Sequence, residues 1–402
     1  MSERKYVVVL GDGMADEPVA ELDGKTPLAY ADTPALDRLS KVSEIGMVHT
    51  IPEGMKPGSD TANLSVLGYD PRRFYSGRSP LEALSIGVPM KDTDVALRCN
   101  IVTISEDAAS FEEQTIIDHS SGEISTEECA VLLEAVRKEL ENETYQFYVG
   151  TSYRHCLIWN QGKVLELSQP HDVLGQVIGQ YLPEDPALLY MMKKSYEILV
   201  NHPINKERKK KGLNPANCCW FWGAGTKPVL SSFEEKTGLK GMMVSAVDLL
   251  KGIAAGAGMG AAQVKGANGG LHTNYEGKVQ AAIDALQNGY DFVYIHVEAP
   301  DEMGHQGSVE KKVQAITYLD HRVIGPLTKL LDKDRVSYRL LVMPDHPTPI
   351  RVRTHTSDSV PYLLYESEFP KEESWNYNEK EAMESGNFVP LGHTIIDRLL
   401  GK

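Results

Sequence analysis

Three short clusters of acids and histidines in the C-terminal half of the chain carry side chains that bind divalent metal ions. Asp301 and His305 form the first cluster, spaced so that one helical turn places both on the same side. Asp345 and His346 form the second, and the prolines on either side of the pair keep it off a helix. His355 lies in the third, shortly before an expected strand. Carboxylate and imidazole ligands suit Mn²⁺ or Zn²⁺ better than Ca²⁺.

Asp12 adds a fourth acid at a comparable place. It follows the continuous aliphatic run of residues 6–10, which is typical of a strand buried on both faces. The first two clusters also follow expected strands, at 292–297 and 338–343. Because ligands of an open α/β sheet bind beyond the carboxyl ends of its strands, these side chains can share one edge. Each cluster alone is more often a cap or a turn, but together they predict two ions, the arrangement that serves phosphoryl transfer.

Ser59 is a hydroxyl residue whose surroundings could make it a nucleophile. It lies in Lys-Pro-Gly-Ser-Asp-Thr-Ala at residues 56–62, where Gly58 frees the backbone and a helix can begin. A hydroxyl at a helix N-terminus faces unpaired N–H groups and the positive end of the helix dipole, where a phosphate binds. The same serine could instead be an N-cap, which is the commoner role in such a segment. The metal clusters favour the nucleophile.

The elements that must position these residues alternate between strands and helices. This alternation predicts an α/β fold with a doubly wound, mostly parallel sheet. The expected strands lie at 6–10, 46–51, 241–245, 292–297, 338–343 and 360–365, and the expected helices at 33–40, 276–287, 309–331 and 393–400. Residues 92–225 have a different pattern and predict a separate, smaller α/β unit that ends in a turn-rich segment at 223–228.

Composition and charge exclude several classes of partner. The chain has 41 Lys and Arg against 56 Asp and Glu, a formal charge of −15, so it has no general attraction for nucleic acid or an anionic membrane. No apolar run approaches the length of a membrane span.

The five cysteines form no Cys-x-x-Cys pair and indicate buried thiols in a cytoplasmic protein. A phosphate-binding loop of the Gly-x-x-x-x-Gly-Lys-Ser/Thr type is missing from the sequence, which argues against a small-molecule kinase. The basic run at 207–212 is typical of a solvated face.

These motifs together resemble a known family. Asp-Gly-Met at 12–14, Pro-Gly-Ser-Asp-Thr-Ala-Asn at 57–63, Pro-Asp-x-x-Gly-His at 300–305, Asp-His at 345–346 and His-Thr at 355–356 are similar to the cofactor-independent phosphoglycerate mutases of the shorter, archaeal type, in the alkaline phosphatase superfamily. The resemblance spans nearly the whole chain. It implies a metal-binding catalytic domain of alkaline-phosphatase type at 1–73 and 228–402. It also implies an inserted smaller α/β domain at 74–227 that closes over the substrate.

The resemblance also implies a cofactor set. Two divalent ions are expected, Mn²⁺ first, with Zn²⁺, Co²⁺ or Mg²⁺ as alternatives, and neither 2,3-bisphosphoglycerate nor a nucleotide is required. The implied ligands of one ion are Asp301, His305 and His355, and those of the other are Asp12, Asp345, His346 and Ser59. A small phosphorylated substrate is the expected partner, and a homo-oligomer is left open.

The implied reaction interconverts 3-phosphoglycerate and 2-phosphoglycerate, in glycolysis or gluconeogenesis, through a phosphoserine at Ser59. Lys251 is similar in placement to the active-site lysine of the family, and Arg98 and Arg154 are candidates to bind the substrate carboxylate, with structural ion pairs as the alternative. The candidates for proton transfer are His155, His171 and Asp172, and His155 and Asp172 are also expected to bind the substrate. The competing functions are a metal-dependent phosphatase or phosphodiesterase, another phosphomutase, a phosphonate hydrolase, and a metal-stabilised binding protein.

Overall fold

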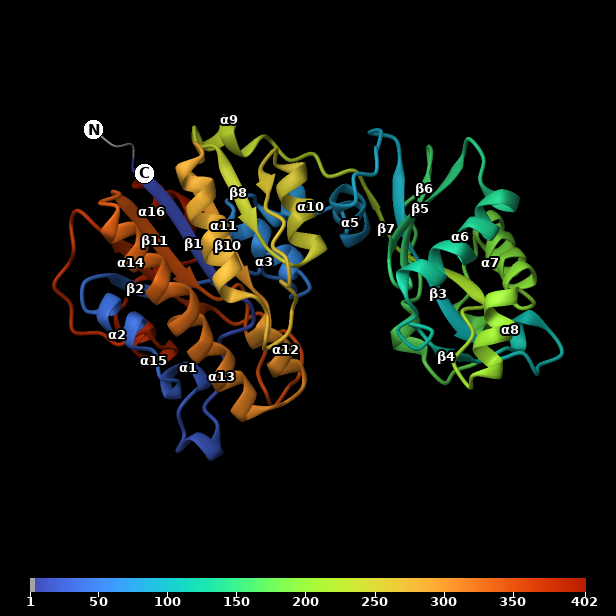
Figure 1. The fold of residues 1–402 in the computed structure, drawn as a ribbon, viewed down its shortest axis with the longest axis horizontal. Helices are drawn as coiled ribbons and strands as arrows, with labels where there is room; N and C mark the ends of the chain where they lie inside the picture. The colour runs from blue at the N-terminus through green and yellow to red at the C-terminus, as the bar shows by residue number, and fades with distance from the viewer. Residues whose placement is uncertain (1–3) are drawn as a thin grey trace. The chain divides into compact units, whose positions relative to one another are not determined.

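The structure is a computed structural model and describes residues 4–402. The chain divides into two compact units. Unit 1 contains the chain up to Tyr75 and from Val229 to Lys402, and unit 2 contains Ser76–Pro228 (Figure 1). Each unit has a sheet and a hydrophobic core of its own.

Unit 1 is built on an eight-stranded sheet in the order β13-β2-β12-β11-β1-β10-β8-β9. Its strands are β1 (Lys5–Gly11), β2 (Glu44–Val48), β8 (Gly241–Val244), β9 (Gly260–Ala261), β10 (Phe292–Val297), β11 (Tyr338–Met343), β12 (Val360–Glu366) and β13 (Phe388–Val389). β12 is antiparallel to both of its neighbours, and the other pairs are parallel. The prediction of a mostly parallel α/β sheet is confirmed.

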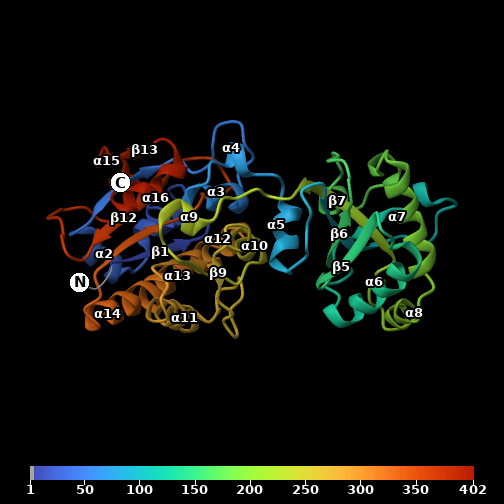
Figure 2. The ribbon, with the colours of Figure 1, turned by 90° about the horizontal axis from the view of Figure 1, so that it is seen from above.

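Helices cover both faces of this sheet, as Figure 2 shows for α11, α13 and α14 on one side and α3 and α16 on the other. The helices of unit 1 are α1 (Pro27–Tyr30), α2 (Pro34–Ser40), α3 (Ser59–Val66), α4 (Pro71–Phe74), α9 (Phe233–Thr237), α10 (Asp248–Gly256), α11 (Tyr275–Gln287), α12 (Ala299–His305), α13 (Val309–Leu319), α14 (Gly325–Lys333), α15 (Glu379–Glu384) and α16 (Ile395–Leu400). Side chains alternate across each strand, so Val7 and Val9 of β1 pack against the first group of helices. Both faces are therefore buried, which explains the continuous apolar runs in the sequence.

The expected long helix at 309–331 is interrupted. A π-helical turn, Asp320–Ile324, separates α13 from α14. Pro326 lacks the N–H that would continue the regular hydrogen-bond pattern across this point. The turn places the Asp320 carboxylate where it accepts the first N–H groups of α2, at 3.0 and 2.7 Å. Thr33 precedes α2 but makes no capping hydrogen bond with its side chain.

Unit 2 contains a five-stranded antiparallel sheet. Its strands are β3 (Val95–Ile104), β4 (Ile116–Asp118), β5 (Tyr145–Thr151), β6 (Arg154–Trp159) and β7 (Cys218–Thr226), and its helices are α5 (Arg78–Ser85), α6 (Thr126–Leu140), α7 (Pro186–Leu199) and α8 (Pro203–Lys210). The expectation of turns at 223–228 is wrong in part, because β7 continues to Thr226 as a partner of β3. Two glycines in this stretch do not prevent the ladder, since the neighbouring strand supplies the hydrogen bonds.

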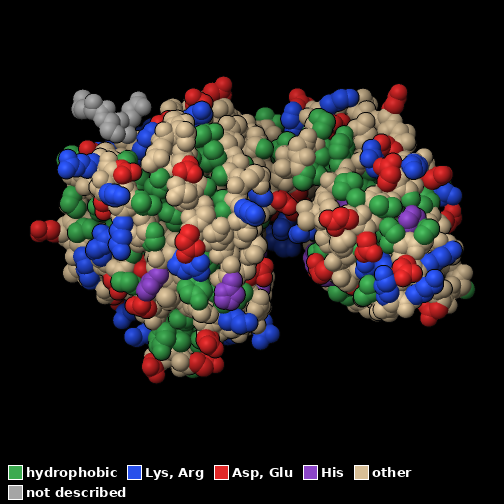
Figure 3. Space-filling view, in the orientation of Figure 1, with side chains coloured by type: hydrophobic (Ala, Val, Ile, Leu, Met, Phe, Trp, Pro, Cys, Tyr) green, Lys and Arg blue, Asp and Glu red, His purple; other side chains and the backbone are tan. Residues whose placement is uncertain are grey.

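The basic run forms the end of α8, where Figure 3 shows Lys and Arg side chains gathered. Lys209, Lys210 and Lys211 are exposed, as expected for a solvated face. Arg208 instead is buried and pairs with Glu128 at 2.6 Å. The five cysteines are buried and unpaired, as predicted. Over residues 4–402, the search for a helix with the length and apolar character of a membrane span finds none.

Candidate metal-binding active site

The acid and histidine clusters meet at the carboxyl edge of the unit 1 sheet. β1, β10 and β11 are adjacent and parallel, so the segments after them, with Asp12, Asp301 and Asp345, leave the sheet at the same edge. His355 reaches this edge by a different route. It precedes β12, and because β12 is antiparallel its beginning lies at the carboxyl ends of the other strands. Residues far apart in sequence are thus brought together.

Asp12, Asp345 and His346 form one compact group. One ligand atom from each lies within 4.8 Å of the others, and all three residues are buried. The Nε2 of His346 is 3.5 Å from Oδ1 of Asp12 and 3.5 Å from Oδ2 of Asp345. The Oγ of Ser59 lies 3.1 Å from the same Nε2, so the serine hydroxyl is at the edge of this group.

A second group lies beside the first and shares His346 with it. Asp301, His346 and His355 offer ligand atoms within 4.8 Å of one another. His305 is also adjacent, with its Nε2 3.2 Å from Oδ2 of Asp301 and 3.0 Å from Nε2 of His355. The rings of His346 and His355 are 4.1 Å apart. His346 therefore lies between the two groups, with His305 and His355 at the more exposed side.

The three buried aspartates of these groups carry negative charge that a cation would neutralise. Burial, followed by the negative charges of Asp345 and Asp301, raises the pKa of Asp12 well above its usual range. Burial also opposes ionisation of Asp301, but hydrogen bonds with His305 and His355 outweigh it and lower its pKa well below the usual range. Among the described residues, no lysine or arginine forms an ion pair with any of the three aspartates.

One acceptor atom in the group has no partner. The Oδ1 of Asp12 is buried and makes no hydrogen bond within residues 4–402. An unpaired buried carboxylate oxygen is costly unless a charge compensates it. The donor set of carboxylates and imidazoles, together with this orphaned oxygen, fits divalent metal ions.

Ser59 is the first residue of α3 and does not cap it. Gly58 occupies the cap position, and no side chain makes a capping hydrogen bond there. The N-cap alternative for Ser59 is therefore wrong, and its hydroxyl points instead to His346. Asn63, one turn along α3, ties the serine to the metal-binding group, because its Nδ2 donates to the carbonyl of Ser59 and to Oδ2 of Asp345, both at 2.8 Å.

Hydrogen bonds with neighbouring residues orient Asp301 and His305. The hydroxyl of Thr348 donates to Oδ1 of Asp301. The Nδ1 of His305 lies 2.9 Å from the carbonyl of Arg353, so its Nδ1–H can donate there and leave Nε2 directed at Asp301. Such bonds fix the rings and carboxylates in the orientation that a metal ion requires.

Comparison with known proteins places these features in a family. A profile described as 2,3-bisphosphoglycerate-independent phosphoglycerate mutase matches residues 40–205. A protein of Geobacter sulfurreducens named a probable 2,3-bisphosphoglycerate-independent phosphoglycerate mutase is 45% identical over 99% of this chain and 100% of its own. A protein of Methanosarcina barkeri, with that name but without the qualifier, is 46% identical over 99% of this chain and 98% of its own. The chain belongs to this family. The resemblance seen in the sequence is confirmed.

Solved structures agree on the fold. A protein of Pyrococcus horikoshii has a TM-score of 0.83 at 30% identity, covering 100% of this chain and 97% of its own. A cofactor-independent phosphoglycerate mutase of Thermoplasma acidophilum has a TM-score of 0.66 at 24% identity, covering 99% of each chain. The second likeness supports the fold alone. Members of the phosphoglycerate mutase family are isomerases, so the chain is assigned to an enzyme family.

Lys251, which the family resemblance suggests for catalysis, lies on α10 next to α3. Its Nζ pairs with Oδ1 of Asp248 at 3.4 Å. Among the described residues it has no hydrogen bond or ion pair with Ser59 or with the three aspartates. The pair with Asp248 is long and partly exposed, which leaves the ammonium group able to turn toward another anion.

Two of the predicted substrate-binding residues have structural partners in unit 2. The guanidinium of Arg98 pairs with Glu82 at 2.8 Å and stacks over the ring of Trp222 at 4.4 Å. His155 is buried, with Nε2 3.1 Å from Sγ of Cys129, while its Nδ1 accepts the N–H of Gly150. Burial lowers the pKa of His155 to about 4, so this ring is neutral at ordinary pH.

The other two predicted residues are exposed. Arg154 stacks over Tyr153 at 5.5 Å and pairs with no carboxylate among the described residues. Asp172 lies 3.7 Å from Nε2 of His171, and its side chain is 63% exposed. Both side chains are accessible from solvent.

His119 lies close to His171, and the sequence analysis did not single it out. Its ring lies 5.8 Å from Tyr153 and 6.0 Å from His171, and His171 in turn contacts Trp222 at 5.4 Å. The Nδ1 of His119 is buried without a hydrogen-bond partner in the described chain. His119 directly follows Asp118, but this Asp-His pair comes after a strand of three residues, and the Asp118 carboxylate accepts hydrogen bonds from Ser120 and Gly122. The neighbours of His119 in space are what draw attention to it.

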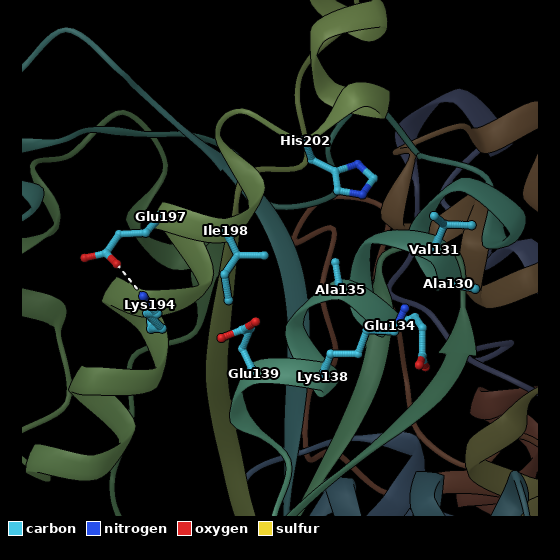
Figure 4. A pocket seen from close by; sticks show the side chains of 10 residues that line it. All are labelled: Ala130, Val131, Glu134, Ala135, Lys138, Glu139, Lys194, Glu197, Ile198 and His202. Atoms are coloured by element: carbon cyan, nitrogen blue, oxygen red, sulfur yellow. Dashed lines mark hydrogen bonds and ion pairs between the residues drawn. The ribbon is translucent and has the colours of Figure 1, made fainter.

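Within the described part of the chain, a groove of about 920 Å³ in unit 2 lacks a group of acids and histidines like those at the edge of the unit 1 sheet. It lies between α6 and α7, with Glu134 and Lys138 on one wall and Lys194 and Glu197 on the other (Figure 4). Lys194 and Glu197 pair with each other at 3.0 Å. Glu134 pairs with Arg137 of the same helix at 3.2 Å. Because these charged side chains pair within their own helices, we assign the groove no role in the reaction.

Proposed function

We propose that this chain is a 2,3-bisphosphoglycerate-independent phosphoglycerate mutase that interconverts 3-phosphoglycerate and 2-phosphoglycerate through a phosphoserine at Ser59, in glycolysis or gluconeogenesis. The observation that carries the proposal is the position of the Ser59 hydroxyl, 3.1 Å from Nε2 of His346, at the start of α3 and beside two groups able to hold metal ions. The full-length relatives supply the substrate class through their names.

The proposed cofactors are two divalent ions, Mn²⁺ first, with Zn²⁺, Co²⁺ or Mg²⁺ as alternatives. One ion is assigned to Asp301, His305 and His355, and the other to Asp12, Asp345, His346 and Ser59. When bound, such ions neutralise phosphoryl oxygens and favour the ionised form of a nearby hydroxyl. The assignment is supported by the unpaired Oδ1 of Asp12 and by the lack of lysine or arginine ion pairs to the aspartates within residues 4–402.

The covalent steps exchange two oxygens on one phosphorus. The Oγ of Ser59 attacks the phosphorus of the substrate and gives up its proton, and the bond from phosphorus to the glycerate oxygen breaks. That glycerate oxygen takes up a proton. After glycerate reorients, its other hydroxyl loses a proton and attacks the phosphorus of the phosphoserine. The bond from phosphorus to Oγ then breaks, and Oγ takes up a proton, which restores Ser59. The N–H groups at the start of α3 and the ammonium group of Lys251 are proposed to stabilise the negative charge of the phosphoryl group.

In unit 2 we propose that Arg154 binds the substrate carboxylate. His119, like Arg154, contacts the ring of Tyr153. A guanidinium offers a planar pair of donors to a carboxylate, and Arg154 has no acidic partner among the described residues. Arg98 forms an ion pair with Glu82 and stacks on Trp222, which in turn contacts His171. We therefore give Arg98 a structural role. For proton transfer we favour Asp172 with His171 over His155, because His155 is buried against Cys129. That residues 74–227 close over the substrate remains a prediction; exclusion of water would protect a phosphoserine from hydrolysis.

The decisive test is an enolase-coupled assay on the purified protein with Mn²⁺ and without 2,3-bisphosphoglycerate. We expect conversion of 3-phosphoglycerate, and Ser59→Ala is expected to lower kcat by about 10⁴-fold or more because the nucleophile is lost. The variant should keep a metal content near that of the parent. A strict need for the bisphosphate, or activity surviving in Ser59→Ala, contradicts the proposal. Release of free phosphate in place of 2-phosphoglycerate would favour a phosphatase.

A further inference from the structure

Strand β10 carries two polar side chains that the reaction scheme does not use. Tyr294 and His296 are two residues apart and so point to the same face, and both are fully buried. On the opposite face of β10, Val293 and Ile295 pack into the apolar core. A tyrosine and a histidine in the centre of a buried strand need polar partners. The partner of His296 is Asp12, and that of Tyr294 is Asn63, which in turn bonds Asp345.

His296 holds one oxygen of Asp12. Its Nε2 lies 3.0 Å from Oδ2 of Asp12, and its Nδ1 lies 3.1 Å from Oγ of Ser245. The hydroxyl of Ser245 accepts the N–H of Val247 at 3.0 Å. With Asp12 ionised, the ring must carry its proton on Nε2, and Ser245 then donates to Nδ1. The hydrogen bonds therefore run in one direction, from Val247 through Ser245 and His296 to Asp12.

This arrangement leaves the other oxygen of Asp12 for a cation. Oδ2 is occupied by His296, while Oδ1 has no hydrogen-bond partner among the described residues and lies 3.5 Å from Nε2 of His346. The carboxylate is thus held with its free oxygen toward the group that it forms with Asp345 and His346.

Tyr294 acts in the same way on Asp345, through Asn63. Its hydroxyl donates to Oδ1 of Asn63 at 2.6 Å. The amide nitrogen of Asn63 then points to two acceptors, Oδ2 of Asp345 and the carbonyl of Ser59. Tyr294 therefore fixes which end of the amide faces the carboxylate.

We propose that His296 and Tyr294 are positioning residues that preorganise the Asp12, Asp345 and His346 group for a divalent cation. The proposal rests on the proposed metal sites. It predicts an asymmetry. Among the described residues, the side chains of Asp301, His305 and His355 make their hydrogen bonds and ion pairs with residues 346–355 and with one another, and not with β10. Loss of a partner that orients a ligand typically weakens metal binding 10- to 100-fold, so one of two binding constants is expected to change.

The test measures Mn²⁺ binding to the metal-free full chain, by the electron paramagnetic resonance signal of free Mn²⁺. The parent is expected to bind two ions. His296→Leu is expected to bind one of them about 10- to 100-fold more weakly and the other unchanged. His296→Gln, whose amide nitrogen can replace the Nε2 donor, is expected to recover most of the affinity. Tyr294→Phe and Ser245→Ala are expected to weaken the same ion by a smaller factor.

Ser195→Ala is the matched control. Ser195 is a buried serine in unit 2 that accepts the N–H of Cys219 at 2.9 Å, much as Ser245 accepts that of Val247. It should leave both Mn²⁺ constants unchanged even if stability falls. Unchanged constants in a folded His296→Leu overturn the inference. If that variant does not fold, unchanged constants in both Ser245→Ala and Tyr294→Phe overturn it. A parent that binds no Mn²⁺ instead contradicts the proposed metal sites.

Discussion

At the scale of single residues, the candidate site depends on close contacts that leave no room for a larger side chain at Gly13. Gly13, next to Asp12, has a positive φ of 59°. A Cβ at this position would lie 2.6 Å from Oδ1 of Asp301 and 2.5 Å from Oγ1 of Thr348. The Asp-Gly pair after β1 is therefore a requirement of the close approach between Asp12 and Asp301, as well as a turn.

Gly13→Ala tests this close approach, with Gly24→Ala as its control. Gly24 also has a positive φ, 75°, but a Cβ there meets no atom within 4 Å. Gly24→Ala is expected to cost about 1 kcal/mol of unfolding free energy from the backbone alone. Gly13→Ala is expected to cost a further ~1–3 kcal/mol from the clash and to weaken Mn²⁺ binding. Urea unfolding and Mn²⁺ titration measure both; equal losses in the two variants would contradict the role of Gly13.

His155 allows a prediction on pH. Burial lowers its pKa from 6.5 to about 4, so the folded chain keeps the ring neutral where the unfolded chain takes up a proton. Its contribution to stability is complete above pH 6.5 and is lost as the pH falls toward 4. The expected loss is about 3 kcal/mol over this range.

The matched variant is His155→Asn, whose side-chain oxygen can still accept the N–H of Gly150 as Nδ1 does. The difference in unfolding free energy between parent and variant is expected to shrink by about 3 kcal/mol between pH 6.5 and 4, because the variant lacks this titration. Urea unfolding at several pH values gives the difference. A constant gap across this range would show that the histidine is not held neutral.

At the scale of elements, the sequence predicts those parts whose local pattern agrees with the fold. The strands at 292–297 and 338–343 are correct to the residue, because each is a mostly apolar run buried on both faces and interrupted by one polar residue only, His296 in the first and Arg339 in the second. The acids that follow them were predictable for the same reason. His296 was not, since it lies within a mostly apolar run and its partners, Asp12 and Ser245, follow other strands.

Other elements depend on neighbours that no local pattern records. β7 continues through glycines because β3 supplies its partners. The antiparallel direction of β12, which brings His355 to the site, follows from the order of the sheet. The helix break before Pro326 was visible in the sequence as a proline, but its use, the capping of α2 by Asp320, was not.

Asp320→Ala tests that capping. The carboxylate accepts two N–H groups at the start of α2, and its removal leaves buried donors without a partner. We expect a loss of about 1–2 kcal/mol in unfolding free energy. Asp37→Ala is the control, because Asp37 is an exposed acid on α2 and should change stability by no more than about 0.5 kcal/mol. Comparable losses of unfolding free energy in both variants would mean that the negative charge near α2, and not the capping hydrogen bonds, stabilises the helix.

At the scale of the whole molecule, the two units differ in what they can bind. Every side chain proposed to hold a metal ion belongs to unit 1, and unit 2 has a separate core formed by its own sheet and helices. A ligand that binds only the folded form stabilises the unit that holds it. Metal binding should therefore act on one unit and leave the other as it was.

Scanning calorimetry of the full chain, with and without Mn²⁺, tests this expectation. Two transitions are expected, and saturating Mn²⁺ at about 100 times its dissociation constant should stabilise one of them by about 2.7 kcal/mol for each bound ion. His155→Asn identifies the other transition, since it alters the core of unit 2 and should move that transition alone. A chelator should return the first transition to its metal-free position. A shift of both transitions by Mn²⁺, or of the one that His155→Asn moves, would contradict the assignment of the ions to the edge of the unit 1 sheet.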